Sequence, residues 1–64
     1  MKLYYVALYN HQANEWARVL LTADLESDAT ATAEEAFNDP NRPRWKVKTV
    51  YDVCSTDDDV WIEM

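Results

Sequence analysis

The sequence KLYYVALYN-HQAN-EWARVLLTA, residues 2–23, contains two strand-like segments on either side of a short connector. Residues 2–10 and 15–23 are rich in β-branched and aromatic side chains, whereas the four residues between them are mostly polar. Two such segments with so short a connector predict an antiparallel hairpin. Because alternate residues of a strand face the same side, we expect one set to form the core: Tyr4, Val6, Leu8, Ala17, Val19 and Leu21.

Downstream of the hairpin, residues 28–38 carry the pattern of an amphipathic helix. Their apolar residues follow the i, i+4, i+7, i+8 spacing of one helix face, at Ala29, Ala33, Ala36 and Phe37. Ser27 or Asp28 is expected to cap the amino end, although the capping-box residues Thr32–Glu35 leave a later start open. Alanines bury little area, so we expect Phe37 to be the main anchor of this helix.

After the helix, residues 44–53 predict a third strand. Alternation assigns its inward positions to Trp45, Val47, Thr49, Tyr51 and Val53. Val50 interrupts the polar pattern of the other side, which indicates either a bulge or a partner contact. Residues 60–62 are a short apolar segment that forms either a fourth strand or a docking segment. Within it, Trp61 is either a core residue or an exposed anchor, and we favour the core for so small a domain.

These segments predict an α+β fold of β-β-α-β-β order, in which one helix packs on one face of a three- or four-stranded, mainly antiparallel sheet. The 64 residues are enough for a single domain, residues 1–64. The chain contains no glycine. Tight turns usually place glycine or asparagine where φ is positive, so we expect asparagine and aspartate residues to form the turns here.

The positive charge of the chain is concentrated in one short segment. Four of the six cations, Arg42, Arg44, Lys46 and Lys48, fall between residues 42 and 48, whereas the rest of the chain holds all twelve acids and only Lys2 and Arg18. In an extended strand Arg44, Lys46 and Lys48 lie on one side, where they are suited to acidic protein surfaces or phosphates. The alternative is that these cations only discourage edge-to-edge aggregation.

The acidic residues offer a second candidate surface. With a net charge of −6, the chain is expected to be repelled by phosphates and attracted to basic grooves, which are common on proteins that handle nucleic acid. Glu34, Glu35 and the run Asp57, Asp58, Asp59 are the candidate residues for such mimicry of nucleic acid. The run lacks the ligand spacing of a calcium loop, so we predict no metal site. The plainer alternative is that acidity only keeps the domain soluble.

Little in the sequence favours catalysis or a cofactor. His11 is the only histidine and lies in a predicted turn, and Cys54 has no histidine near it in the sequence. No glycine-rich phosphate loop is present. We therefore expect a protein that is not an enzyme and binds no cofactor. A lone cysteine and the absence of a signal-peptide or membrane-spanning pattern favour a cytoplasmic protein without membrane contacts.

Aromatic residues also fall on the side of the hairpin opposite the predicted core, at Tyr5, Tyr9 and Trp16. An aromatic surface of this kind is a candidate interface. It suits a homodimer or a platform on which the bases of nucleic acid stack, although the net negative charge argues against direct binding of nucleic acid.

The order of elements, with Arg44-Trp45-Lys46-Val47-Lys48-Thr49-Val50 following a helix that contains Glu34-Glu35-Ala36, resembles small acidic phage proteins that disable host machinery. It is similar to the host RNA polymerase inhibitors of T7-like phages and, in size and acidity, to anti-CRISPR proteins. The functional strand of those polymerase inhibitors bears arginine, whereas lysines stand at 46 and 48 here.

This resemblance implies a non-catalytic viral protein in the host cytoplasm that blocks a nucleic-acid-handling complex, such as RNA polymerase or a CRISPR effector. Its partner-binding residues would be Arg44, Lys46, Lys48, Asp57, Asp58, Asp59, Trp61, Glu34 and Glu35. Direct binding of nucleic acid through the third strand and surface aromatics, and a homodimeric assembly module, are the alternatives.

Overall fold

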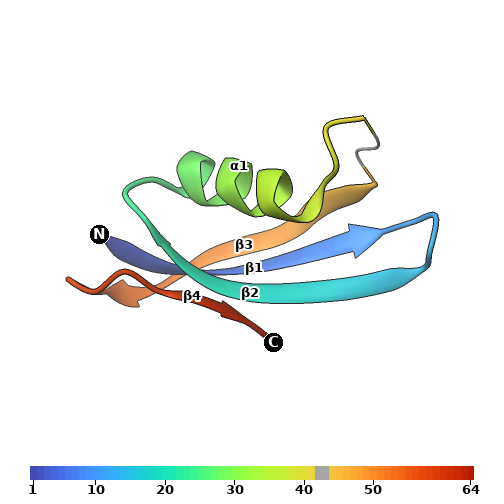
Figure 1. Cartoon of the computed structure of the whole chain (residues 1–64). Coiled ribbons are helices and arrows are strands. Elements are labelled where there is room, and N and C mark those ends of the chain that lie inside the picture. The colour runs from blue at the N-terminus through green and yellow to red at the C-terminus, as the bar shows by residue number, and fades with distance from the viewer. Residues whose placement is uncertain (42–43) are drawn as a thin grey trace.

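The computed structural model describes residues 1–41 and 44–64 and has one helix packed on a four-stranded antiparallel sheet (Figure 1). The strands lie in the order β3-β1-β2-β4. Their bounds and that of the helix are β1 Lys2–Asn10, β2 Glu15–Ala23, α1 Glu26–Phe37, β3 Trp45–Ser55 and β4 Trp61–Glu63. The predicted α+β fold and the β-β-α-β-β order are therefore confirmed.

The hairpin of β1 and β2 has the predicted bounds and is turned by asparagines. The buried Asn10 side chain accepts hydrogen bonds from the backbone N–H groups of Gln12 and Ala13, at 3.1 and 3.2 Å. Asn14 adopts a φ of 54°, in the left-handed region that asparagine tolerates better than most residues. Asparagine thus takes the place that glycine would otherwise occupy.

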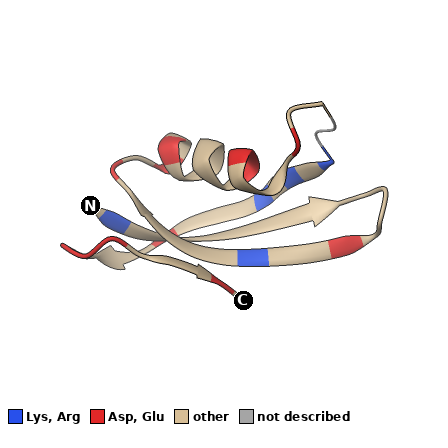
Figure 2. Ribbon diagram, viewed as in Figure 1, with Lys and Arg blue, Asp and Glu red and all other residues tan. Residues whose placement is uncertain are grey.

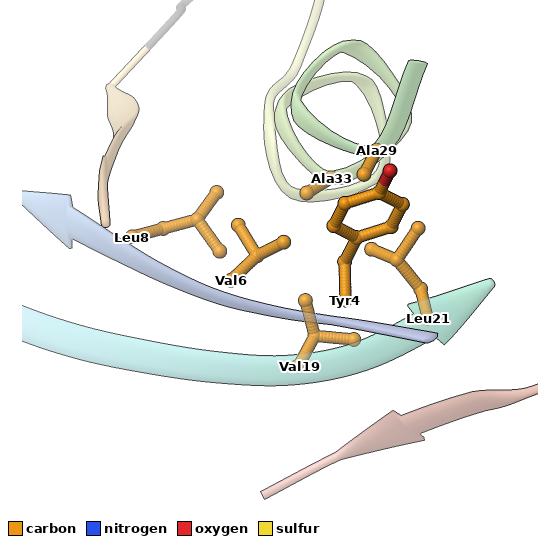
Figure 3. Packing of buried hydrophobic residues seen from close by; sticks show 7 residues of the cluster. All are labelled: Tyr4, Val6, Leu8, Val19, Leu21, Ala29 and Ala33. Carbon is orange, nitrogen blue, oxygen red and sulfur yellow. The ribbon is translucent and has the colours of Figure 1, made fainter. Parts of the chain in front are cut away.

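The core lies between this hairpin and the helix. Tyr4, Val6 and Leu8 of β1 and Val19 and Leu21 of β2 are buried beneath Ala29 and Ala33 of α1 (Figure 3). The small alanines let the helix backbone approach the sheet closely, and the larger strand residues fill the layer between them. The predicted core side of the hairpin is confirmed, and Phe37 packs against this core as expected.

β3 departs from the predicted alternation because it contains two bulges. The register with β1 shifts between Ala7 and Leu8, which leaves Lys48 without a partner, and again between Leu3 and Tyr4, which leaves Val53 without one. An extra residue reverses the phase of the alternation beyond it. Trp45 and Val47 therefore face the core as predicted, but beyond the first bulge Val50 replaces Thr49, so the prediction for Thr49, Tyr51 and Val53 was wrong.

The helix begins earlier than predicted and has no side-chain cap. Its N-cap residue is Leu25, whose φ of −129° and ψ of 154° are the extended values usual at that position, and no side chain bonds the free N–H groups. The prediction of Ser27 or Asp28 as the cap was wrong. Both lie in the first turn instead, where Asp28 and Glu26 favourably face the positive end of the helix dipole.

The two edge strands are held to the rest of the molecule by polar and aromatic contacts. The Asn38 side chain, just after α1, accepts a hydrogen bond from Trp45 N–H at 2.7 Å and donates one to Trp45 C=O at 2.9 Å. Thr22 of β2 exchanges two hydrogen bonds with the backbone of Val60, which leads into β4. The Phe37 ring lies 5.5 Å from that of Trp45 and 6.5 Å from that of Trp61, so it links both edges to the helix.

Candidate functional site

The structure has two distinct surfaces: the side covered by α1, which we call the helix side, and the uncovered sheet face, which we call the outer face. Residues of β1 and β2 that point away from the core define the outer face. The registers arrange it in cross-strand rows. From the hairpin end these rows are Trp16-Tyr9-Lys46, Arg18-Ala7-Thr49, Leu20-Tyr5-Tyr51 and Thr22-Leu3-Cys54.

Aromatic side chains dominate two of these rows. The rings of Tyr9 and Trp16 lie 4.8 Å apart and are tilted, and those of Tyr5 and Tyr51 lie 4.9 Å apart and are stacked. Trp16 remains 61% exposed and Tyr51 52% exposed. The prediction that Tyr5, Tyr9 and Trp16 form an aromatic surface opposite the core is confirmed, and the bulged β3 adds Tyr51 to it.

Cations border the aromatic rows. Lys46 lies beside Tyr9 and Arg18 beside Ala7, and Lys48 is the unpaired residue at the first bulge of β3. All three side chains are exposed. Figure 2 shows basic segments on both β2 and β3. Arg42 lies outside the described residues.

Arg44 belongs to a different environment. It precedes β3 and lines a hollow with Phe37, Asp39 and Trp45 on the helix side. Of the predicted row of Arg44, Lys46 and Lys48, the structure therefore brings Lys46 to the outer face, leaves Lys48 exposed at the bulge of β3 and places Arg44 beside the end of the helix.

Acidic residues are absent from the outer-face positions of the described strands. Glu15 pairs with Asn10, Asp52 with Tyr4 and Glu63 with Val19, all partners whose side chains face the helix side. Lys2 Nζ lies 3.2 Å from Asp52 Oδ2 on that side. The Lys2 ammonium group donates a hydrogen bond to the Asp52 carboxylate, and this bond raises the pKa of Lys2.

The remaining acids follow the helix and its two ends. Glu26, Asp28, Glu34 and Glu35 lie on α1, and Asp39 follows it (Figure 2). Glu34, Glu35 and Asp39 line an open hollow that extends to His11 and to Lys46 at the sheet edge. We call the surface formed by the four acids of α1 and by Asp39 the acidic helix surface.

The predicted run Asp57, Asp58 and Asp59 is exposed in the loop between β3 and β4. This loop leaves the sheet where Ser55 pairs with Lys2, and Lys2 also pairs with Ala23, which leads into the amino end of α1. The run therefore lies at the opposite end of the helix from Glu34 and Glu35. The two groups of acids are therefore separated by roughly the length of the helix, which is about 18 Å for twelve residues.

Trp61 lies on the helix side, opposite Leu21, and its indole N–H donates a hydrogen bond to Glu63. It contacts Phe37 but stays 42% exposed, so the prediction that it completes the core was wrong. β4 has only three residues and is an edge strand of the sheet, so it does not bury so large a ring. Trp61 is instead an exposed aromatic next to the helix.

The other polar candidates lie apart from one another. His11 is exposed in the hairpin turn and Cys54 is exposed on β3. Among the described residues no group of three or more histidine, cysteine or acidic side chains is arranged to hold a metal ion. The described part of the chain also has no helix with the length and hydropathy needed to cross a membrane.

No family model, curated protein or solved structure matches this chain. Its two surfaces therefore supply the arguments about function.

Proposed function

We propose that this chain is a non-catalytic binding protein that occupies a basic groove of a protein complex that handles nucleic acid, and so blocks that complex. The observation that carries the proposal is the separation of charge: the acids of the described strands and of α1 lie on the helix side, whereas the charged residues at the outer-face strand positions are all cations. A surface with one sign of charge attracts the opposite sign and speeds association.

The acidic helix surface supports this role by its shape. Its carboxylates lie on one rigid helix and just beyond its end, and the run Asp57–Asp59 adds three more at the other end. A groove that binds a phosphate backbone is lined by lysine and arginine. Carboxylates on this helix and at its two ends supply the complementary charge without a nucleic acid being present.

Arg44, Lys46 and Trp61 lie around this surface and extend its contacts. Arg44 and Lys46 border the hollows at the end of the helix, where they are placed to pair with acids at the edge of a basic groove. The exposed Trp61 ring supplies an aromatic anchor of the kind that interfaces favour. The phage inhibitor class fits this mode of action, in which steric and electrostatic occlusion replaces chemistry.

An affinity pull-down tests the proposal. The tagged protein is incubated with nuclease-treated bacterial lysate, so that nucleic acid cannot bridge, and retained proteins are identified after washes at low and high salt. We expect one nucleic-acid-handling complex to be retained and to be lost at high salt.

A pair of charge-reversed variants makes the test specific. Glu34→Lys with Glu35→Lys should abolish retention, whereas Glu15→Lys with Asp24→Lys changes the net charge equally at exposed positions outside the acidic helix surface and should retain most of it. Circular dichroism checks that both variants fold. Equal retention by the Glu34/Glu35 variant and the intact protein would contradict the proposal.

A further inference from the structure

We propose that the outer face is a second binding site, separate from the acidic helix surface, and that its occupant is single-stranded nucleic acid. The site consists of the aromatic pairs Tyr9–Trp16 and Tyr5–Tyr51 and the bordering cations Arg18, Lys46 and Lys48. Two independent features of this face lead to that occupant: its rings and its charge.

The rings provide a platform for stacking. Each pair joins neighbouring strands, with Tyr9 and Tyr5 on the central strand β1. The pairs are separated by four residues along β1, or about 13 Å. Trp16 and Tyr51 are each more than half exposed, so ring surface is available to a ligand. Bases of a single strand stack on aromatic side chains of this kind, whatever their sequence.

The charge of the face selects an anion. Arg18 and Lys46 lie in the two rows nearest the hairpin, around the Tyr9–Trp16 pair, and the exposed Lys48 lies at the β3 bulge between these rows. No acid occupies an outer-face position in the described strands, although the chain has twice as many acids as cations. The negative net charge is therefore carried by the other side of the molecule, and a phosphate backbone on this face meets cations.

The same charge argues against a second copy of the chain. Packing two outer faces together would bring both sets of Arg18, Lys46 and Lys48 into one interface with no acid at the strand positions to pair with them. Buried like charges without partners are costly. Duplex DNA is also a poor fit, because its bases are stacked on each other and offer no free faces to Trp16 or Tyr51.

The test uses fluorescence anisotropy at low salt with labelled oligothymidine and oligouridine of about 12 nucleotides, a length within the range of known single-strand sites. We expect both single strands to bind and a matched duplex to bind at least tenfold more weakly. Substitution of Trp16→Ala or Tyr51→Ala should each weaken binding at least about fivefold.

Charge variants supply an independent readout. Removing both lysines with Lys46→Gln and Lys48→Gln should lower the slope of log affinity against log salt by about 0.7 for each cation lost. The matched controls are Lys2→Gln, a cation on the helix side, and Trp61→Phe, an aromatic on that side. Both should bind single strands as the intact protein does.

Three results would overturn this inference: no binding of either single strand at low salt, equal binding of the duplex, or equal losses in the controls. A molecular mass of twice 7.5 kDa in analytical ultracentrifugation, abolished by Trp16→Ala, would assign the face to a second copy. Outer-face variants leave the acidic helix surface intact. Failure here therefore differs from failure of the proposed function, which the Glu34 and Glu35 substitutions report.

Discussion

At the scale of single residues, asparagine side chains form the hairpin turn and join the helix to β3 in a chain without glycine. Asn10 and Asn14 turn the hairpin, and Asn38 fastens the helix to β3 through two hydrogen bonds. The amide side chain suits these positions because it both donates and accepts hydrogen bonds and because asparagine tolerates a positive φ.

Replacing Asn38 with alanine should destabilise the fold by about 1–3 kcal/mol, since two hydrogen bonds to the Trp45 backbone are lost. Urea denaturation followed by circular dichroism measures the change. Ser27→Ala serves as the control, because Ser27 is exposed and caps nothing, and it should shift stability by less than about 0.5 kcal/mol. Equal effects of the two substitutions would refute the role of Asn38.

The ion pair of Lys2 and Asp52 makes a pH-dependent prediction. The pKa of Lys2 is raised above its ordinary value of 10.5, so the pair stabilises the fold below that pH and its contribution disappears as the pH rises through the raised pKa. Lys2→Gln should therefore have a slightly lower urea midpoint than the intact protein at pH 8. The gap between the two midpoints should narrow as the pH rises above 10.5, and a gap that stays constant there would contradict the assignment.

Residue patterns predicted the use of asparagine in turns but not the contact between Asn38 and Trp45. The first follows from local backbone geometry and from the absence of glycine. The contact between Asn38 and Trp45 joins residues seven positions apart, and no periodic pattern of the sequence specifies such a contact.

At the scale of elements, the hairpin was predictable and β3 was only partly so. β1 and β2 alternate regularly, so pattern and structure agree from Lys2 to Ala23. β3 lies at the sheet edge and carries two bulges, each of which reverses the alternation. Val50 gave the one sign of a bulge in the sequence. Neither the position of the bulge nor the outward turn of Tyr51 could be predicted from that sign alone.

The uncapped helix predicts a stabilising substitution. Leu25 is exposed and has the backbone conformation of an N-cap, so Leu25→Ser should supply the missing side-chain acceptor and add about 0.5–2 kcal/mol. In a domain of this size that corresponds to a rise in melting temperature of roughly 4–8 °C for each kcal/mol. Leu25→Ala, which removes the same apolar side chain without adding an acceptor, should give no increase.

The core layer is thin, so it should be sensitive to truncation. Leu8 is fully buried beneath α1, and Leu8→Ala should cost about 2–5 kcal/mol. A chain this short has little stability to spare, so we expect much of the variant to be unfolded at 37 °C by circular dichroism. A cooperative transition as high as that of the intact protein would show that the core lies elsewhere.

At the scale of the whole molecule, the net charge does not indicate how the charges are distributed over the two sides. A value of −6 averages an acidic helix side with a cationic outer face, and it made direct binding of nucleic acid look unfavourable. The clustering of Lys46 and Lys48 was visible in the sequence. Their position relative to the acids was not visible in the sequence, because it depends on the register of three strands and on the side that the helix covers.

The two proposals together describe a small protein that would attach to a complex by one side and contact an exposed strand with the other. The acidic helix surface would exclude nucleic acid from a basic groove. The outer face would hold a single strand nearby. Apart from Lys46, which borders both surfaces, each role rests on residues that the other does not use, so substitutions of Glu34 and Glu35 or of Trp16 and Tyr51 should each leave binding at the other surface unchanged.

The most direct test of occlusion is competition on the complex that the pull-down retains. Labelled duplex DNA is bound to that complex, and its anisotropy is followed as the protein is added. We predict displacement of the DNA by the intact protein and by an outer-face variant, Trp16→Ala with Tyr51→Ala, but not by Glu34→Lys with Glu35→Lys. DNA that stays bound while the intact protein also occupies the complex would contradict the proposed function.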